Sequence, residues 1–291
     1  MGSNPALFQE IERHFILFIQ NAFLEDIQEA DHTSEACIPA DKHGQAKLLV
    51  KDQGILAGVE MARRIFYFAD QSLELEAFLN DGASVRNGDV AFTVKGSLRS
   101  ILKSERIVLN CMQRMSGIAT KTHQMVQRLK GTGTRLLDTR KTTPGIRFLE
   151  KWAVAIGGGE NHRFGLYDMI MIKDNHIDAA GGIGNAIAMA KSYLQRHGLN
   201  LAIEVETRSL EEVQEVLKHG PVQRIMLDNF SPDLIQEALT LISGKCETEA
   251  SGGINDTNLA QYAQTGVNYI SSGAITHSAM PLDLSLKVSF V

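Results

Sequence analysis

The chain has 291 residues, of which 44% are hydrophobic and 22% charged, with 29 lysines and arginines against 34 aspartates and glutamates. This balance excludes a disordered or collagen-like protein. At about 150 residues per domain, the length favours two domains or one large one. The net charge of −5 argues against general nucleic-acid binding, which depends on a basic face that neutralises phosphates.

The cysteines Cys37, Cys111 and Cys246 are too few and too widely spaced for a disulfide framework or a Cys-x-x-Cys metal motif. They fit free thiols in a reducing compartment. No segment has the roughly 18 consecutive apolar residues of a membrane span, and the early apolar run 15–19 is too short for a signal-peptide core. We therefore expect a cytoplasmic protein that does not act at a membrane.

The N-terminal third predicts a mixed α+β domain. Apolar residues spaced three to four apart over Leu7–Asp26 predict an amphipathic helix that packs on the core. Short apolar runs within 48–58 predict a hairpin, and 89–95 predicts a further strand. Ser104 is a candidate N-cap for a long helix that continues to Leu129 and connects the two domains.

From Gly133 onward, short apolar runs alternate with helical stretches, which is typical of βα units around a parallel sheet. The predicted strands are 134–138, 167–172, 201–206, 223–228, 246–251 and 267–272, and the predicted helices are 146–156, 186–197, 210–219, 232–242 and 258–264. Six units can be counted, not eight. The sequence therefore predicts an α/β fold in which an N-terminal α+β sandwich-like domain precedes an incomplete, open β/α barrel.

Nearly every predicted strand of this region ends in residues able to do chemistry. These positions are 139–141, 173, 206, 228, 251–253 and 272–273. The carboxyl ends of barrel strands meet at one rim, where barrel enzymes carry their active sites. We therefore expect a single site there.

Cations cluster in the loops of the expected rim. They are Arg140, Lys141, His162, Arg163 and Lys173. Such a concentration, on a chain of negative net charge, predicts binding of an anionic ligand. Solvated surface charge is the alternative, and it explains any single one of them better than it explains all five.

Glycines and carboxylates complete the expected site. Gly252, Gly253 and Gly273 could expose backbone amides to a phosphate, although each alone is more often a turn. The glycines at 157–159 allow a sharp turn or the close approach of a ligand. Neither a dinucleotide fingerprint nor a Walker A loop occurs.

Glu204 and Glu206 face the same side of a predicted strand, and Asp228 ends the next strand. Carboxylates beside one another suit the hydroxyl groups of a ribose and its Mg²⁺. For Glu204 alone, a structural salt bridge is the slightly favoured interpretation.

Several motifs together resemble one family. They are Leu137-Asp138-Thr139-Arg140-Lys141-Thr142-Thr143-Pro144-Gly145, Gly157-Gly158-Gly159 followed by His162-Arg163, Ile172-Lys173-Asp174-Asn175-His176, Glu204-Val205-Glu206, Leu227-Asp228-Asn229, Ala250-Ser251-Gly252-Gly253-Ile254 and Ser272-Gly273-Ala274-Ile275-Thr276-His277-Ser278, with Ser104-Glu105-Arg106 upstream. Over at least residues 85–287 the chain resembles the quinolinate phosphoribosyltransferases, also called carboxylating nicotinate-nucleotide pyrophosphorylases.

The resemblance implies transfer of a phosphoribosyl group from phosphoribosyl pyrophosphate to quinolinate. Pyrophosphate and CO₂ are lost, and nicotinate mononucleotide is formed for NAD synthesis. No cofactor other than Mg²⁺, carried on the pyrophosphate and not held directly by protein ligands, is implied.

The resemblance also assigns roles to residues. It places Arg106, Arg140, His162, Arg163 and Lys173 around the carboxylates of quinolinate, where Arg can bind in bidentate fashion. It places Lys141, with Lys173 and His277, at the phosphates, and Glu206 and Asp228 at the ribose hydroxyls. The other implied substrate contacts are Thr139, Ser251, Gly252, Gly253, Ser272, Gly273 and Ala274. Lys141, Glu206 and Asp228 are the expected catalytic residues.

Arg106 is implied to reach the neighbouring subunit's site, so we expect a homodimer. We place the first domain at 1–116, joined by the tail 278–291, and the barrel at 117–277. Three rival functions stay open at this point: a Schiff-base lyase that uses Lys173, an enzyme of the same fold that acts on another ring acid, and a non-catalytic sensor of phosphoribosyl ligands.

Overall fold

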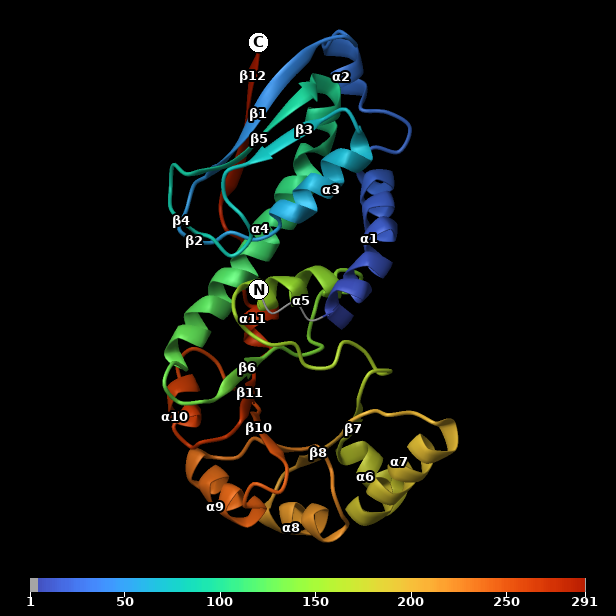
Figure 1. The fold of residues 1–291 in the computed structure, drawn as a ribbon, viewed down its shortest axis with the longest axis vertical. Helices are drawn as coiled ribbons and strands as arrows, with labels where there is room; N and C mark the ends of the chain where they lie inside the picture. The colour runs from blue at the N-terminus through green and yellow to red at the C-terminus, as the bar shows by residue number, and fades with distance from the viewer. Residues whose placement is uncertain (1–4, 291) are drawn as a thin grey trace. The chain divides into compact units, whose positions relative to one another are not determined.

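The computed structural model describes residues 5–290, and the side chains of residues 14–289 (Figure 1). It divides into two compact units, one formed by residues up to 123 with 142–158 and the chain from 275 onward, the other by 124–141 and 159–274. This division differs from the predicted domains mainly at 142–158, which joins the first unit. Within the described residues no helix is both long and apolar enough to cross a membrane.

The first unit is built on an antiparallel sheet of strand order β12-β1-β5-β3. Its strands are β1 (His43–Val50), β3 (Glu74–Ala77), β5 (Val90–Ser97) and β12 (Leu284–Phe290), with a small ladder of β2 (Gly54–Ile55) and β4 (Ser84–Val85). Its helices are α1 (Pro5–Asp26), α2 (His32–Cys37), α3 (Val59–Ala69) and α5 (Arg147–Ile156), while α4 (Leu98–Arg128) and α11 (Ala274–His277) each contribute residues to both units. The tail enters this sheet through β12, which pairs with β1.

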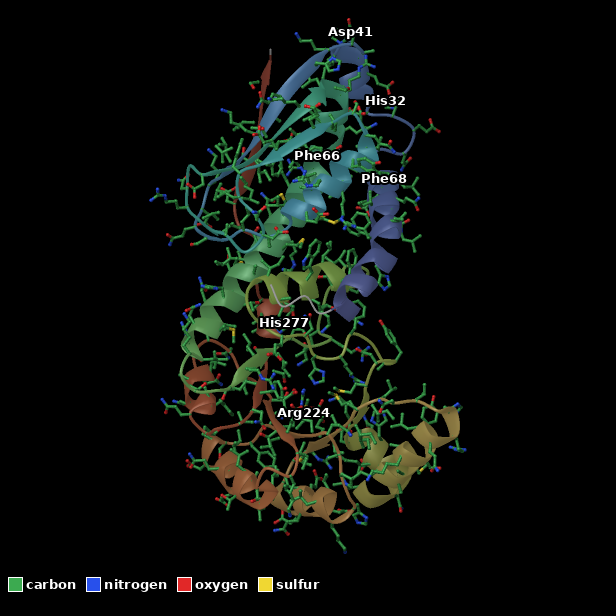
Figure 2. All side chains as sticks on the ribbon, viewed as in Figure 1. His32, Asp41, Phe66, Phe68, Arg224 and His277 are labelled. Atoms are coloured by element: carbon green, nitrogen blue, oxygen red, sulfur yellow. The ribbon has the colours of Figure 1, made fainter. Side chains whose placement is uncertain are left out.

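The core of the first unit follows from alternation along β1, where Ala46, Leu48 and Val50 are buried on one face. Phe66 of α3, labelled in Figure 2, packs edge-on against Phe92 of β5 with ring centroids 6.1 Å apart. The predicted first helix is confirmed as α1, although Leu7, Phe8 and Ile11 of its expected apolar face lie outside the described side chains.

The second unit is an open barrel of parallel strands in the order β6-β11-β10-β9-β8-β7. The strands are β6 (Arg135–Leu137), β7 (Ile170–Ile172), β8 (Ile203–Thr207), β9 (Arg224–Asp228), β10 (Glu247–Ser251) and β11 (Tyr269–Ser271). The helices are α6 (Asp174–Ala180), α7 (Ile183–His197), α8 (Leu210–Lys218), α9 (Pro232–Ile242) and α10 (Leu259–Ala263), and they surround the strands in Figure 1. The predicted fold class is confirmed, since β6 and β7 form the two ends of an unclosed sheet.

Several local predictions are wrong. Ser104 is not an N-cap, because α4 begins at Leu98 and the Ser104 hydroxyl donates to the carbonyl of Ser100 one turn earlier. The hairpin within 48–58 does not form, since β1 pairs with β5 and β12 while β2 pairs with β4. By contrast, the sharp turn predicted for 157–159 is present, since a turn follows α5 and Gly158 has a φ of 91°. Gly157 also serves helix packing, because a Cβ there would lie 2.5 Å from the carbonyl oxygen of Ala119.

Candidate active site

The barrel carries polar residues at the carboxyl ends of its strands, as expected. Glu206 lies near the end of β8, Asp228 ends β9 and Ser251 ends β10, and these three strands are neighbours in the sheet. Parallel pairing brings the ends of all such strands to one edge. The rim predicted from the sequence is therefore present.

Lys173 and Glu206 are brought together at this rim. Lys173 follows β7 and its ammonium donates to the Glu206 carboxylate, which is mostly buried. The side chain of Lys173 stays partly exposed, and its amide donates to Nδ1 of His176 over 2.9 Å. Two residues that the family resemblance assigns to substrate contacts thus form an ion pair with each other.

Asp228 and Asn229 shape the loop that follows β9. Asn229 adopts the left-handed conformation with φ of 59°, and its side-chain amide donates to Asp228 over 2.6 Å. The backbone amide of Asn229 donates to the carbonyl of Ser251 over 2.9 Å, and this hydrogen bond joins the ends of β9 and β10. Gly252 has a φ of 96°, and a Cβ there would lie 2.2 Å from the side-chain oxygen of Asn229, so only glycine fits.

Two guanidinium groups lie within reach of each other's charge at the same rim. Burial and the charge of Arg140 both lower the pKa of Arg163, and the charges of Asp168 and Glu204 offset only part of this effect. The Arg163 side chain also donates to the carbonyl of Met169 over 3.4 Å. Like charges held together are costly unless an anion joins them. This arrangement favours an anionic ligand.

Ser272, Gly273 and Ala274 are among the residues that the family resemblance assigns to the substrate. The Ser272 hydroxyl is buried and donates to the carbonyl of Ile254 over 2.6 Å, and its amide donates to Leu137 over 3.1 Å. Gly273 follows it directly, and Ala274 begins the short helix α11. Ser272 therefore ties the ends of two strands and the loop after β10 together.

Lys141 and Thr139 follow β6. The amide of Lys141 donates to the Thr139 hydroxyl over 3.0 Å, and the Lys141 side chain is exposed. Arg106 and His277 belong to the first unit, so the structure does not place them at the rim. His277 is exposed beside the Ser278 hydroxyl, 2.7 Å away, and Arg106 lines a cavity of about 570 Å³ with residues of α1 and α5.

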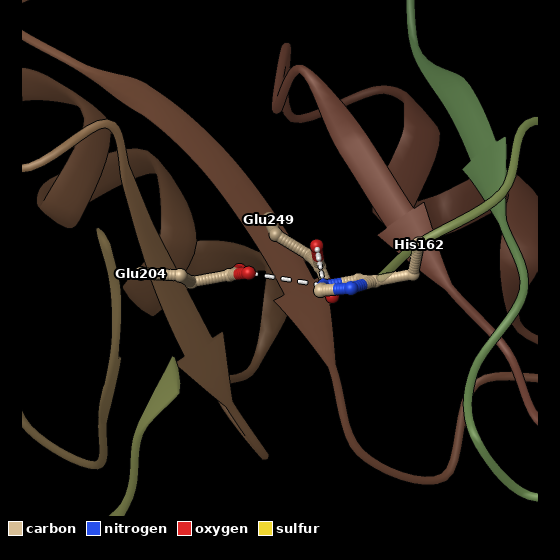
Figure 3. Close-up of side chains that lie close together, drawn as sticks. All are labelled: His162, Glu204 and Glu249. Atoms are coloured by element: carbon tan, nitrogen blue, oxygen red, sulfur yellow. Dashed lines mark ion pairs between the residues drawn. The ribbon is translucent and has the colours of Figure 1, made fainter. Parts of the chain in front are cut away.

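His162 takes a position that the sequence did not reveal. Its ring is buried inside the barrel, with Nε2 3.0 Å from Glu204 of β8 and 3.2 Å from Glu249 of β10 (Figure 3). Burial alone would lower the pKa of the ring, but the two close carboxylates and their charges raise it to about 9. The slight preference for Glu204 as a salt-bridge residue agrees with this contact.

Sequence reasoning missed Glu249, Arg224 and Asp138. Arg224 donates to Glu249 over 3.0 Å, and buried Asp138 accepts the amide of His162 over 2.8 Å. The alternation of Glu247, Glu249 and Ser251 along one strand was the available signal, because it places all three on one face. Nothing in the sequence indicated which partners they meet.

The chain matches the family models described as the N-terminal domain of quinolinate phosphoribosyl transferase, over residues 31–116, and its C-terminal domain, over residues 118–287. The chain belongs to the quinolinate phosphoribosyltransferase family. A relative from Nicotiana glauca named quinolinate phosphoribosyltransferase [decarboxylating] 2, mitochondrial, is 47% identical over 89% of this chain and 77% of its own length. A Bacillus subtilis relative, named probable nicotinate-nucleotide pyrophosphorylase [carboxylating], is 42% identical over 93% of this chain and 92% of its own.

The solved structures agree with this family membership. The crystal structure of NadC from Streptococcus pyogenes superposes with a TM-score of 0.90 at 38% identity, and it covers 97% of both chains. The nicotinate-nucleotide pyrophosphorylase from Francisella tularensis gives a TM-score of 0.89 at 37% identity, over 95% of this chain and 96% of that one. The family's two-domain fold is thus present over nearly the whole chain.

Proposed function

We propose that this family member transfers the phosphoribosyl group of phosphoribosyl pyrophosphate to the ring nitrogen of quinolinate, with decarboxylation to nicotinate mononucleotide, in NAD biosynthesis. The observation that carries the proposal is the charge arrangement at the rim. Arg140 and Arg163 suit a dicarboxylate, while Glu206 and Asp228 on neighbouring strands suit a sugar that becomes cationic.

In the transfer step, the pyridine nitrogen forms a bond to the anomeric carbon of ribose. The bond from that carbon to pyrophosphate breaks, and its electron pair leaves with pyrophosphate. Glu206 and Asp228 stabilise the positive charge that develops on the ribose, and Lys141 stabilises the leaving group. In the second step, the carboxylate beside the ribosylated nitrogen leaves as CO₂, its bonding electrons remain on the cationic ring, and a proton takes its place.

Mg²⁺ fits the donors available at this rim. Glu206 and Asp228 offer carboxylate oxygens, the ligands that Mg²⁺ prefers, and Mg²⁺ usually keeps water and phosphate oxygens as its other ligands. We propose that Mg²⁺ arrives on phosphoribosyl pyrophosphate and supplies charge neutralisation for the pyrophosphate. The two carboxylates would meet its bound water.

The 5-phosphate is assigned to the loops after β10 and β11. The assigned residues are Ser251, Gly252, Gly253, Ser272, Gly273 and Ala274. Gly252 and Gly253 both have positive φ, with values of 96° and 62°. Glycine at such positions leaves the backbone amides accessible to an anion, which supports the assignment.

The deciding experiment is a coupled assay of pyrophosphate release with quinolinate, phosphoribosyl pyrophosphate and Mg²⁺, together with measurement of CO₂ release. We expect activity with quinolinate and none with nicotinate. Replacement of Arg140 by lysine should raise the KM for quinolinate, because a point charge cannot bind a carboxylate in bidentate fashion. Arg208→Lys is the matched control, since Arg208 lies on the surface paired with Glu212. A folded protein without pyrophosphate release would overturn the proposal.

The homodimer and the role of Arg106 belong to the same proposal. Arg106 is exposed on α4, as a residue that reaches another subunit needs to be. If Arg106 completes the partner's site, mixing equal amounts of inactive Arg106→Ala and inactive Lys141→Ala subunits should restore about a quarter of the activity. About half of the dimers are then mixed, and each mixed dimer has one intact site of two. Absence of recovery in exchanged subunits would contradict it. The cytoplasmic location stays a prediction, testable by cell fractionation.

A Schiff-base lyase is the rival that the geometry addresses. The side-chain nitrogen of Lys173 is paired with the Glu206 carboxylate and is therefore not presented to a carbonyl substrate. Borohydride should therefore trap no carbonyl substrate on Lys173. The sensor hypothesis differs in its outcome, since it requires tight ligand binding without formation of pyrophosphate.

A further inference from the structure

The barrel interior contains a buried charged group whose two carboxylates have no part in the proposed chemistry. It consists of His162, Glu204, Glu249 and Arg224, here called the His162 cluster. The ring lies between the two carboxylates (Figure 3), and Nη1 of Arg224 lies 3.0 Å from the Glu249 oxygen that faces the ring. Glu204 and Glu249 are fully buried. These residues come from β8, β9, β10 and the loop after α5.

Three converging ligand atoms of a histidine and two glutamates could also hold a metal ion. Arg224 argues against that use. The Oε2 atom of Glu249 already accepts the Arg224 guanidinium and lies 3.2 Å from the ring. A second cation there would meet the charge of Arg224 at close range. The cluster is better balanced by protons than by a divalent metal.

The cluster is incompletely hydrogen-bonded for a structural core. Three buried carboxylate oxygens, both of Glu204 and Oε1 of Glu249, have no donor in good hydrogen-bond geometry among the described residues. Buried carboxylates in this state are costly, and an apolar core would be more stable. Such a cost is typical of positions that serve a site.

The ring is connected to the rim through its own backbone. Nδ1 of His162 lies 2.7 Å from the amide nitrogen of Arg163, and the amide of His162 donates to Asp138 over 2.8 Å. Asn161 donates to the same carboxylate over 2.7 Å, and Glu160 forms a bridge with Leu137 of β6. Residues 160–162 are therefore held by contacts of both their backbone and the His162 ring, and Arg163 follows this fixed segment directly.

We propose that Glu204 and Glu249 are positioning residues of the anion subsite, because they hold the His162 ring inside the barrel and thereby set where the Arg163 guanidinium stands at the rim. The inference rests on the proposed function, in which Arg163 binds quinolinate. A shift of about 1 Å in a binding group can cost on the order of a hundredfold in rate, so a loosened ring should be measurable.

The test compares two replacements of Glu204 by steady-state kinetics. Glu204→Leu removes the acceptor for Nε2 and should raise the KM for quinolinate by on the order of tenfold, with the KM for phosphoribosyl pyrophosphate nearly unchanged. Glu204→Gln keeps an acceptor oxygen and should restore most of the quinolinate affinity. Glu212→Leu is the matched control, because this carboxylate on α8 pairs with Arg208 and lies outside the cluster.

If Glu204→Leu does not fold, Glu204→Asp gives the same test, since it keeps the charge but withdraws the carboxylate from the ring. Equal changes in both KM values, or an unchanged quinolinate KM in a folded Leu or Asp variant, would overturn the inference. A stoichiometric metal in the wild-type protein that is lost in Glu204→Gln would also overturn it. Wild-type protein without pyrophosphate release would instead overturn the proposed function, so the two failures are distinguishable.

Discussion

Two buried charged groups in this molecule are built differently. In the first unit, Glu150 is fully buried and accepts from Arg114, over 3.1 and 2.8 Å, and from the amide and hydroxyl of Thr143, over 3.1 and 2.8 Å. In the second unit, Glu204 is equally buried and forms an ion pair with the His162 ring, but among the described residues neither of its oxygens has a hydrogen bond of good geometry. A buried carboxylate whose oxygens all accept hydrogen bonds, here called saturated, stabilises the fold. One that lacks such donors is costly and is tolerated where it serves a functional site.

The largest expected effect tests the saturated group. Glu150→Ala removes four hydrogen bonds and leaves the Arg114 charge without its carboxylate. Breaking a buried pair from one side typically costs about 3–5 kcal/mol. Urea unfolding should show this loss in the free energy of unfolding. In the protein that remains folded, the ratio of the KM for quinolinate to the KM for phosphoribosyl pyrophosphate should be unchanged. A selective rise in one KM would contradict the purely structural role.

The opposite result is expected for Lys141, which stands at the rim two residues before Thr143. Its side chain is exposed, so Lys141→Ala should leave the melting temperature nearly unchanged. Loss of a cation at the leaving pyrophosphate should lower kcat by about 10²–10³-fold. Pre-steady-state measurement of pyrophosphate release checks this. Loss of thermal stability in parallel with turnover would count against a catalytic role.

A pH dependence separates the two groups further. Glu204 and Glu249 raise the pKa of His162 to about 9, and burial with the charge of Glu249 raises the pKa of Glu204. Both shifts mean that the folded cluster keeps a proton that the unfolded chain releases. The resulting stability is fully present below about pH 6.5 and is lost as the pH rises through 9.

This loss should amount to about 3 kcal/mol, because the pKa of His162 rises from 6.5 to about 9 on folding. Urea unfolding at pH 6, 7.5 and 9 measures it, with Glu204→Gln as the comparison, since that variant removes a titrating carboxylate and should flatten the profile. Stability that stays constant or increases over this range in the wild type would contradict the assignment.

The contrast between these groups also marks the limit of what the sequence could predict. Short apolar runs between helical stretches predicted where the strands lie, and polar residues at the strand ends indicated the rim. Both signals depend only on residues that are neighbours in the chain. The pairing of Lys173 with Glu206 and the burial of His162 depend on which strands become neighbours. Residues such as Glu150 and Asp138 look like ordinary helix and strand carboxylates until the fold brings their donors to them.

The smallest effect on stability is expected at Tyr269 of β11, whose ring and hydroxyl both have partners. The ring of Tyr269 lies 4.2 Å from the Arg135 guanidinium and 4.0 Å from that of Arg224, and its hydroxyl donates to Glu247 over 2.9 Å. Tyr269→Phe keeps the ring and its cation–π contacts and removes only the hydroxyl, so it should cost about 1 kcal/mol of stability.

Because Arg224 belongs to the His162 cluster and also contacts Tyr269, this variant shows whether the two ends of the interior act as one network. If they are separate, as the saturated contacts of Tyr269 indicate, Tyr269→Phe leaves the KM for quinolinate unchanged, whereas Glu204→Leu raises it. A tenfold rise in the Tyr269→Phe protein would show that any disturbance of the interior reaches Arg163, and would remove the special role given to Glu204 and Glu249.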